Sequence, residues 1–185
     1  FCSYLRKKGG EVMVQLLGEV KINQFLEHIV SQFTIGEFEK KEFMYRFHRN
    51  DALCVIGYEK QSKLFSRNYN FTIIVEKTIS TSSLVKQEVS YSFQKKCWVG
   101  KTPSALLVLA NKQFSLDWHV VDFTSLTMSE DHFKRTLKMT ILPGSYTSLI
   151  FPPMRQAITL YEEEIKALQS IITIVSSKLD CSIDQ

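Results

Sequence analysis

The sequence predicts an α+β fold: a mixed or antiparallel sheet with packing helices and a long C-terminal stalk helix. Several segments alternate apolar and polar residues with a period of two, which is typical of strands. One early segment repeats apolar residues at helical spacing, and the pattern after Phe151-Pro152-Pro153 is helical to the end. We therefore expect an α+β body over residues 1–150 and a long helix over 151–185. The 185 residues, 44% of them apolar, suffice to bury a core.

The first elements change from a helical period to a period of two. Residues 12–16 alternate briefly and predict a short strand. Apolar residues recur at helical spacing over 21–33, which predicts an amphipathic helix that Gly36 closes. The next strands are predicted over 43–47, 53–56, 71–75 and 85–93, with a turn at Arg49-Asn50-Asp51 between the first two.

The following region is less regular. The wholly apolar run 105–110 predicts a central buried strand. Two more strands are predicted over 118–123 and 135–142. Between them, Ser129 precedes two acidic residues and predicts the N-cap of a short helix.

The C-terminal segment carries an apolar heptad stripe. A helix over 154–179 would be about 39 Å long, so part of it is expected to project from a body of this size. A second apolar set lies beside the stripe, so we expect one face to pack on the sheet and another to contact a partner. The alternative is a wholly buried core helix. The stripe consists of Ile158, Tyr161, Ile165, Leu168, Ile172, Val175 and Leu179.

The sequence shows no catalytic or cofactor motif. Phosphate-binding loops, nucleophile elbows and zinc-protease motifs are all missing, so we expect no catalysis, no cofactor and no metal. The four cysteines are spread over the chain without a CxxC pair, which favours a reducing, intracellular compartment.

The charge is unevenly distributed along the chain. Residues 1–112 hold 17 Lys+Arg against 10 Asp+Glu, whereas residues 113–185 hold 6 against 9. A basic body suggests an anionic partner such as nucleic acid, although scattered lysines often form only a solvated face. The basic positions that could meet such a partner are Arg6-Lys7-Lys8, Lys40-Lys41, Lys95-Lys96, Lys101 and Lys112. Among them, Lys95, Lys96, Lys101 and Lys112 are the candidates for phosphate contact.

Three short motifs occur in order between residues 104 and 179. Residues 106–112 (Leu-Leu-Val-Leu-Ala-Asn-Lys) look like a buried strand ending in Ala-Asn-Arg, and Leu116-Asp117-Trp118 is similar to an Ile-Asp/Asn-Trp element. Residues 157–165 look like the start of a long terminal helix. In these motifs the second half, most closely over 104–150, resembles the transducer domain of topoisomerase VI B subunits and their diverged meiotic B-like relatives.

The resemblance implies a non-catalytic subunit. It would couple a topoisomerase VI B-like head to an A-like DNA-cleaving partner in meiotic double-strand break formation, in the nucleus. The C-terminal helix would hold the partner interface, and Trp118 would lie at a nucleic-acid contact. Here Trp118-His119-Val120-Val121 keeps only the Trp of the family's Trp-Lys-x-Tyr element. The interface residues would be Ile158, Tyr161, Ile165, Leu168, Ile172 and Val175.

Two other classes of function remain open. A head with a coiled-coil stalk, as in scaffold proteins of DNA repair, centriole or kinetochore assembly, explains the heptads equally well. An enzyme with an unrecognised site is the other open class. We expect no small-molecule substrate. We also expect no membrane contact, since the longest apolar run is far shorter than the roughly 20 residues of a membrane span.

Overall fold

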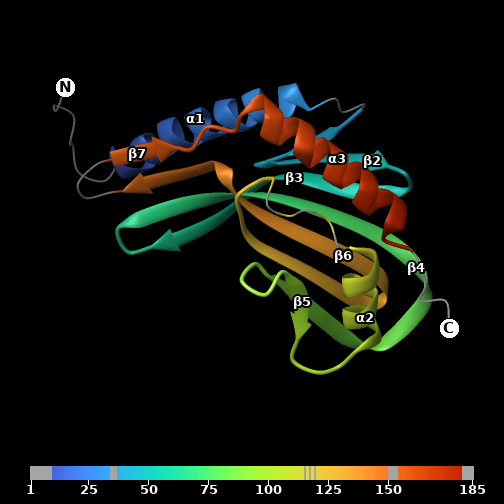
Figure 1. The fold of residues 1–185 in the computed structure, drawn as a ribbon. Coiled ribbons are helices and arrows are strands. Elements are labelled where there is room, and N and C mark those ends of the chain that lie inside the picture. The colour runs from blue at the N-terminus through green and yellow to red at the C-terminus, as the bar shows by residue number, and fades with distance from the viewer. Residues whose placement is uncertain are drawn as a thin grey trace.

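The computed structural model describes residues 10–33, 37–114, 116, 118, 120–149 and 154–180, without the side chains of 10–20 and 81–84. The predicted α+β class is confirmed, because helices cover one face of a single sheet whose described pairings are all antiparallel (Figure 1). The described elements are α1 (Gly10–Gln32), β1 (Glu39–Lys41), β2 (Met44–Arg49), β3 (Ala52–Lys63), β4 (Ser66–Ser92), β5 (Cys97–Gly100), α2 (Ala105–Gln113), β6 (Phe123–Leu149), β7 (Met154–Ala157) and α3 (Glu162–Lys178).

The two longest strands, β4 and β6, each fold back on themselves. The arms of β6 lie side by side: Leu142 N donates to Asp122 O over 2.8 Å, and Thr124 Oγ1 donates to Thr140 O over 3.2 Å. The first arm of β4 pairs with residues 134–149, and its last arm pairs with residues 127–132. Strand β4 therefore bends around the tip of the β6 hairpin, where the register shifts between Thr78 and Gln87 (Figure 1).

The core lies between the sheet and the helices. Alternate residues of β4 and β6, including Phe71, Ile73 and Met139, are fully buried. Their neighbours along the strands face the opposite side of the sheet. Helix α1 contacts β3 and β6, α3 contacts β3 and β4, and α2 contacts β4, β5 and β6. The buried side chains described for all three helices belong to the same cluster, so no described helix covers the other face of the sheet.

Most of the predicted strands are confirmed. The segments 43–47, 53–56, 71–75, 85–93 and 135–142 fall largely on β2, β3, β4 and β6. The helix predicted over 21–33 is the C-terminal half of α1. The predicted turn is present as well, since Asn50 and Asp51 both have a positive φ, which suits a two-residue hairpin turn. Gly36 lies outside the described residues.

Four local predictions are wrong. Residues 12–16 are part of α1. The described residues 118 and 120–122 form no strand, and β6 begins only at Phe123. Ser129 lies inside β6, where the buried Glu130 has the alternating burial of a strand. The run 105–110 is helical because Ser104 caps it: Leu107 N donates to Ser104 Oγ over 3.2 Å. Only one face of that helix is buried.

The C-terminal helix exists but is shorter than predicted. Residues 154–157 form β7, which pairs with the end of β6, and α3 begins only at Glu162. Three acidic residues occupy its first turn, and Tyr161 N donates to Glu164 Oε2 over 2.8 Å, an arrangement that favours a helix start there. With 17 residues, α3 is about 26 Å long. It lies across the sheet rather than projecting as a stalk (Figure 1).

Candidate nucleic-acid interface

Residues 85–114 form a small lobe, here called the lysine lobe, from the last arm of β4, β5 and α2 (Figure 1). The side chain of Asn111 joins α2 to β5: Trp98 N donates to its Oδ1 over 2.9 Å, and its Nδ2 donates to Trp98 O over 3.1 Å. The Asn111 amide thus pairs with β5 as a neighbouring strand would. The indole N–H of Trp98 donates to Phe114 O over 3.1 Å, which fixes the end of α2.

This packing gives a stability prediction for Asn111. Replacing it by aspartate keeps an acceptor for Trp98 N but removes the donor to Trp98 O, at an expected cost of about 1–2 kcal/mol in unfolding free energy. Urea unfolding followed by tryptophan fluorescence measures the difference. The exposed-side control Val108→Ala on the same helix is expected to stay within about 0.5 kcal/mol of wild type. Equal midpoints for Asn111→Asp and wild type would contradict the strand-like role.

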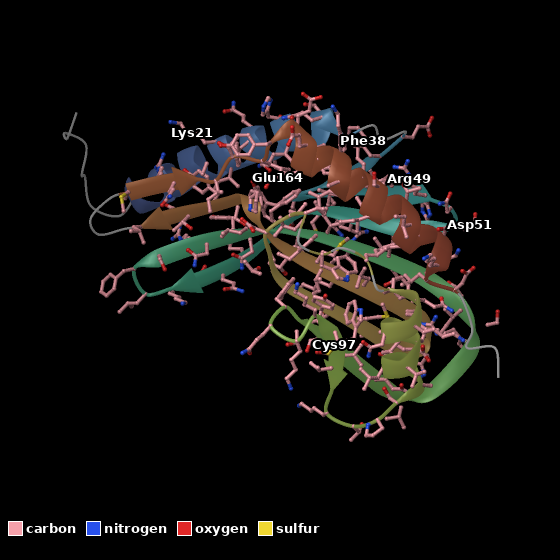
Figure 2. The ribbon with its side chains drawn as sticks, in the orientation of Figure 1. Lys21, Phe38, Arg49, Asp51, Cys97 and Glu164 are labelled. Carbon is pink, nitrogen blue, oxygen red and sulfur yellow. The ribbon has the colours of Figure 1, made fainter. Side chains whose placement is uncertain are left out.

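The lobe gathers the lysines that the sequence singles out. Lys95 and Lys96 lie in the turn between β4 and β5, Lys101 follows β5, and Lys112 lies in the last turn of α2; Lys86 on β4 joins them. Cys97, at the start of β5, marks the lobe in Figure 2. All five lysines are exposed, whereas Glu88 is the one acidic residue between 85 and 114.

Unlike many lysines elsewhere, these five make no ion pair with any described residue. Lys40, Lys77, Lys134, Lys138 and Lys166 each bind a carboxylate. A paired lysine is partly neutralised, so its attraction for an external anion is reduced. The lysine lobe therefore presents a local excess of unneutralised positive charge.

Trp118 lies beneath this surface, and its burial gives no support to the predicted nucleic-acid contact at this residue. The side chain is 1% exposed and its indole N–H donates to Phe114 O over 3.3 Å. Its ring packs against Trp98, with centroids 6.1 Å apart, and against Phe123 at 5.8 Å. These contacts give Trp118 a packing role beneath the lobe.

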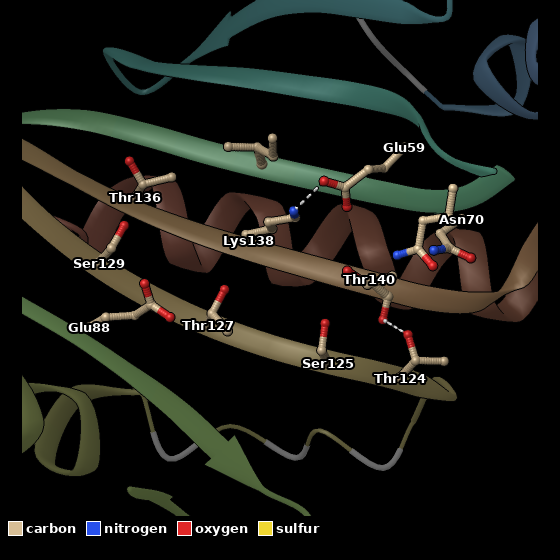
Figure 3. A pocket seen from close by; sticks show the side chains of 12 residues that line it. Glu59, Asn70, Glu88, Thr124, Ser125, Thr127, Ser129, Thr136, Lys138 and Thr140 are labelled. Carbon is tan, nitrogen blue, oxygen red and sulfur yellow. Dashed lines mark hydrogen bonds and ion pairs between the residues drawn. The ribbon is translucent and has the colours of Figure 1, made fainter. Parts of the chain in front are cut away.

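The uncovered face of the sheet forms a polar groove of about 570 Å³ (Figure 3). Lys138 and Glu59 form an ion pair across it, with Nζ 2.8 Å from Oε1. Six of its lining residues are serines or threonines and none is a histidine or cysteine. The hydroxyl, amide and carboxylate side chains that line it give the groove hydrogen-bonding capacity. Its sequence signal is the alternation of hydroxyl side chains along 125–129 and 136–140.

Residues 32–179 match the sequence model of a family described as "Protein of unknown function (DUF3156)". The chain belongs to the DUF3156 family. The matched range includes the whole sheet, the lysine lobe and α3. No curated protein and no solved structure matches the chain.

In this DUF3156 chain, the predicted partner interface lies mostly inside the core. Ile165, Leu168, Ile172 and Val175 are buried against the chain's own sheet. Ile158 precedes the helix and is half-buried, and Tyr161 is 67% exposed. Because β7 and α3 share the sheet and core of the preceding residues, the four buried side chains could reach a partner only if α3 left the sheet.

The buried titratable groups of the DUF3156 chain serve packing. Burial raises the pKa of Cys54, whose Sγ lies 3.7 Å from Ser176 Oγ. Burial also raises the pKa of Tyr58, whose hydroxyl donates to Gly144 O over 2.6 Å. A thiol and a phenol held protonated are poor nucleophiles.

The described residues also lack two other kinds of site. No group of three or more His, Cys, Asp or Glu side chains among them is placed to hold a metal ion. None of the described helices combines the length and apolar character needed to span a membrane.

Proposed function

We propose that this DUF3156 chain is a non-catalytic binding module that contacts the phosphate backbone of nucleic acid through the lysine lobe. The observation that carries the proposal is the set of five exposed lysines with no ion pair to any described residue. Lysine side chains supply mobile point charges that neutralise phosphates and release condensed counterions. Such contacts give affinity without reading base sequence.

The surroundings of these lysines favour duplex backbone over single strands. The aromatic residues of the lobe are Tyr91, Phe93, Trp98 and Phe114. Trp98 and Phe114 are buried, and Tyr91 and Phe93 are half-buried and pack edge to face, so none presents a fully exposed ring on which unpaired bases could stack. Val85 and Val108 are its large exposed apolar residues, and neither is a Trp, Phe or Leu, the residues that typically insert into a bilayer surface. A double-stranded backbone needs positive charge alone.

Coupling to an A-like DNA-cleaving subunit, and with it a nuclear location, stays a prediction. Residues 106–112 support that resemblance as a strand, but all of them lie on α2, and residues 157–161 precede α3. A coiled-coil scaffold would need the apolar stripe of α3 for contact with another chain. Most of that stripe is already buried in the core of this chain. The backbone-contact proposal depends on neither reading.

Binding of the full chain to a mixed-sequence DNA duplex tests the proposal by fluorescence anisotropy. The variant has Lys95, Lys96, Lys101 and Lys112 replaced by glutamine. The control has Lys21, Lys41, Lys134 and Lys166 replaced by glutamine, which removes the same charge outside the lobe. At low salt, the lobe variant is expected to lose about a hundredfold or more in affinity. The control is expected to lose far less. Equal losses in both sets would show a net-charge effect and defeat the proposal.

A further inference from the structure

The turn between β3 and β4 projects from the sheet and carries two large apolar residues. Leu64 is 82% exposed and Phe65 is 60% exposed. The hairpin lies at the end of the molecule opposite to α2 in Figure 1. Apolar exposure of this kind is concentrated at a tip, where no other described segment covers it.

Neither turn geometry nor packing requires these residues. Two-residue hairpin turns favour Asn, Asp or Gly because those residues accept a positive φ. The β2–β3 turn follows this rule, since Asn50 and Asp51 both have a positive φ. Neither Leu64 nor Phe65 has a positive φ. Two large apolar side chains left in water lose the favourable free energy of burial. Polar residues in a solvated turn would carry no such cost.

Positive charge surrounds the tip. Lys63 and Arg67 flank it on the two strands, and residues 60–69 contain no Asp or Glu. The β6–β7 end lies beside it, since Ser66 pairs with Leu149 and Leu149 pairs with Met154. That segment adds an exposed Met154 and Arg155, and residues 146–157 also lack acidic residues. Lys63, Arg67 and Arg155 form no ion pair with a described residue.

We propose that this end of the chain docks on the surface of an anionic lipid bilayer. Leu64 and Phe65 enter the boundary between headgroups and acyl chains, and Lys63, Arg67 and Arg155 lie at the level of the lipid phosphates. A narrow tip of two residues offers far less area than a stable protein interface needs, whereas a bilayer requires no matching pocket. The sequence-level expectation of no membrane contact rested on the lack of a spanning segment, which surface docking does not use.

Vesicle co-sedimentation of the full chain tests the docking. We expect binding to phosphatidylcholine vesicles that contain phosphatidylglycerol, and binding about tenfold or more weaker without the anionic lipid. The variant Leu64→Ser with Phe65→Ser is expected to lose at least about tenfold in affinity, because its apolar insertion is removed. The matched control, Val85→Ser with Val108→Ser, removes exposed apolar residues at the other end and is expected to bind as wild type does.

A second readout separates the tip from the lysine lobe. A tryptophan at position 65 (Phe65→Trp) is expected to shift its emission to shorter wavelength when anionic vesicles are added, and the lysine-lobe variant is expected to keep vesicle binding. The proposal is overturned if wild type does not sediment with anionic vesicles, if the double-serine variant binds equally well, or if the tip instead mediates self-association without lipid in analytical ultracentrifugation.

Discussion

Replacing Arg135 by methionine is expected to lower the free energy of unfolding by about 3–5 kcal/mol. Arg135 is 5% exposed and its partner Glu130 is 8% exposed. Its Nε and Nη2 donate to Glu130 Oε2 over 3.0 and 2.8 Å, and its Nη1 donates to Leu179 O over 2.7 Å. The substitution would leave a buried carboxylate and a helix-terminal carbonyl without these donors. Urea unfolding followed by circular dichroism measures the change.

Two further variants separate this pair from an ordinary ion pair. Lys134 forms an exposed pair with Glu76, and Lys134→Met is expected to cost less than about 1 kcal/mol. Combining Arg135→Met with Glu130→Leu removes the stranded carboxylate, so much of the stability is expected to return. A single variant as stable as wild type would mean that the arginine does not hold the β6 hairpin to the end of α3.

The second large effect is expected at Leu168, which is fully buried at the centre of α3. Leu168→Ala is expected to destabilise the isolated chain by about 2–5 kcal/mol through lost burial and a residual cavity. Calorimetric or urea unfolding of the monomer measures it. Tyr161→Ala, just before the helix and exposed, is the matched control and is expected to change stability by less than about 0.5 kcal/mol.

This comparison distinguishes a core helix from a projecting stalk. In a stalk, Leu168 would contact a partner, and its replacement would leave the unfolding free energy of the isolated chain unchanged while weakening a complex. A wild-type midpoint for Leu168→Ala would therefore contradict the packing of α3 on the sheet.

The sequence predicts best those elements whose burial is periodic over several residues. Alternation in residues 71–75 and 135–142 reflects a sheet with one covered face, and the structure has that face. The run 105–110 is ambiguous because a short apolar segment fits a buried strand or a helix equally well. The cap at Ser104 would have decided it. The heptad stripe is real from Ile165 onward, but its first two members precede the helix.

The rest depends on contacts distant in sequence. No local pattern shows that β4 bends around the tip of the β6 hairpin, because that bend results from pairing between residues about 50 positions apart. The buried pair of Glu130 and Arg135 appears in sequence as two ordinary surface charges. The lysines of the lobe can be picked out singly, but their gathering and lack of carboxylate partners follow from the fold.

The salt dependence of duplex binding tests the proposed backbone contact most directly. If four lysines of the lobe neutralise phosphates, a plot of log K against log salt concentration is expected to have a slope of about −3 to −4 for wild type. The variant with Lys95, Lys96, Lys101 and Lys112 replaced by glutamine keeps only Lys86 of the lobe and is expected to have a slope of about −1 or shallower. A shallow wild-type slope, or the same steep slope in both proteins, would contradict the assignment of the lobe as the nucleic-acid interface.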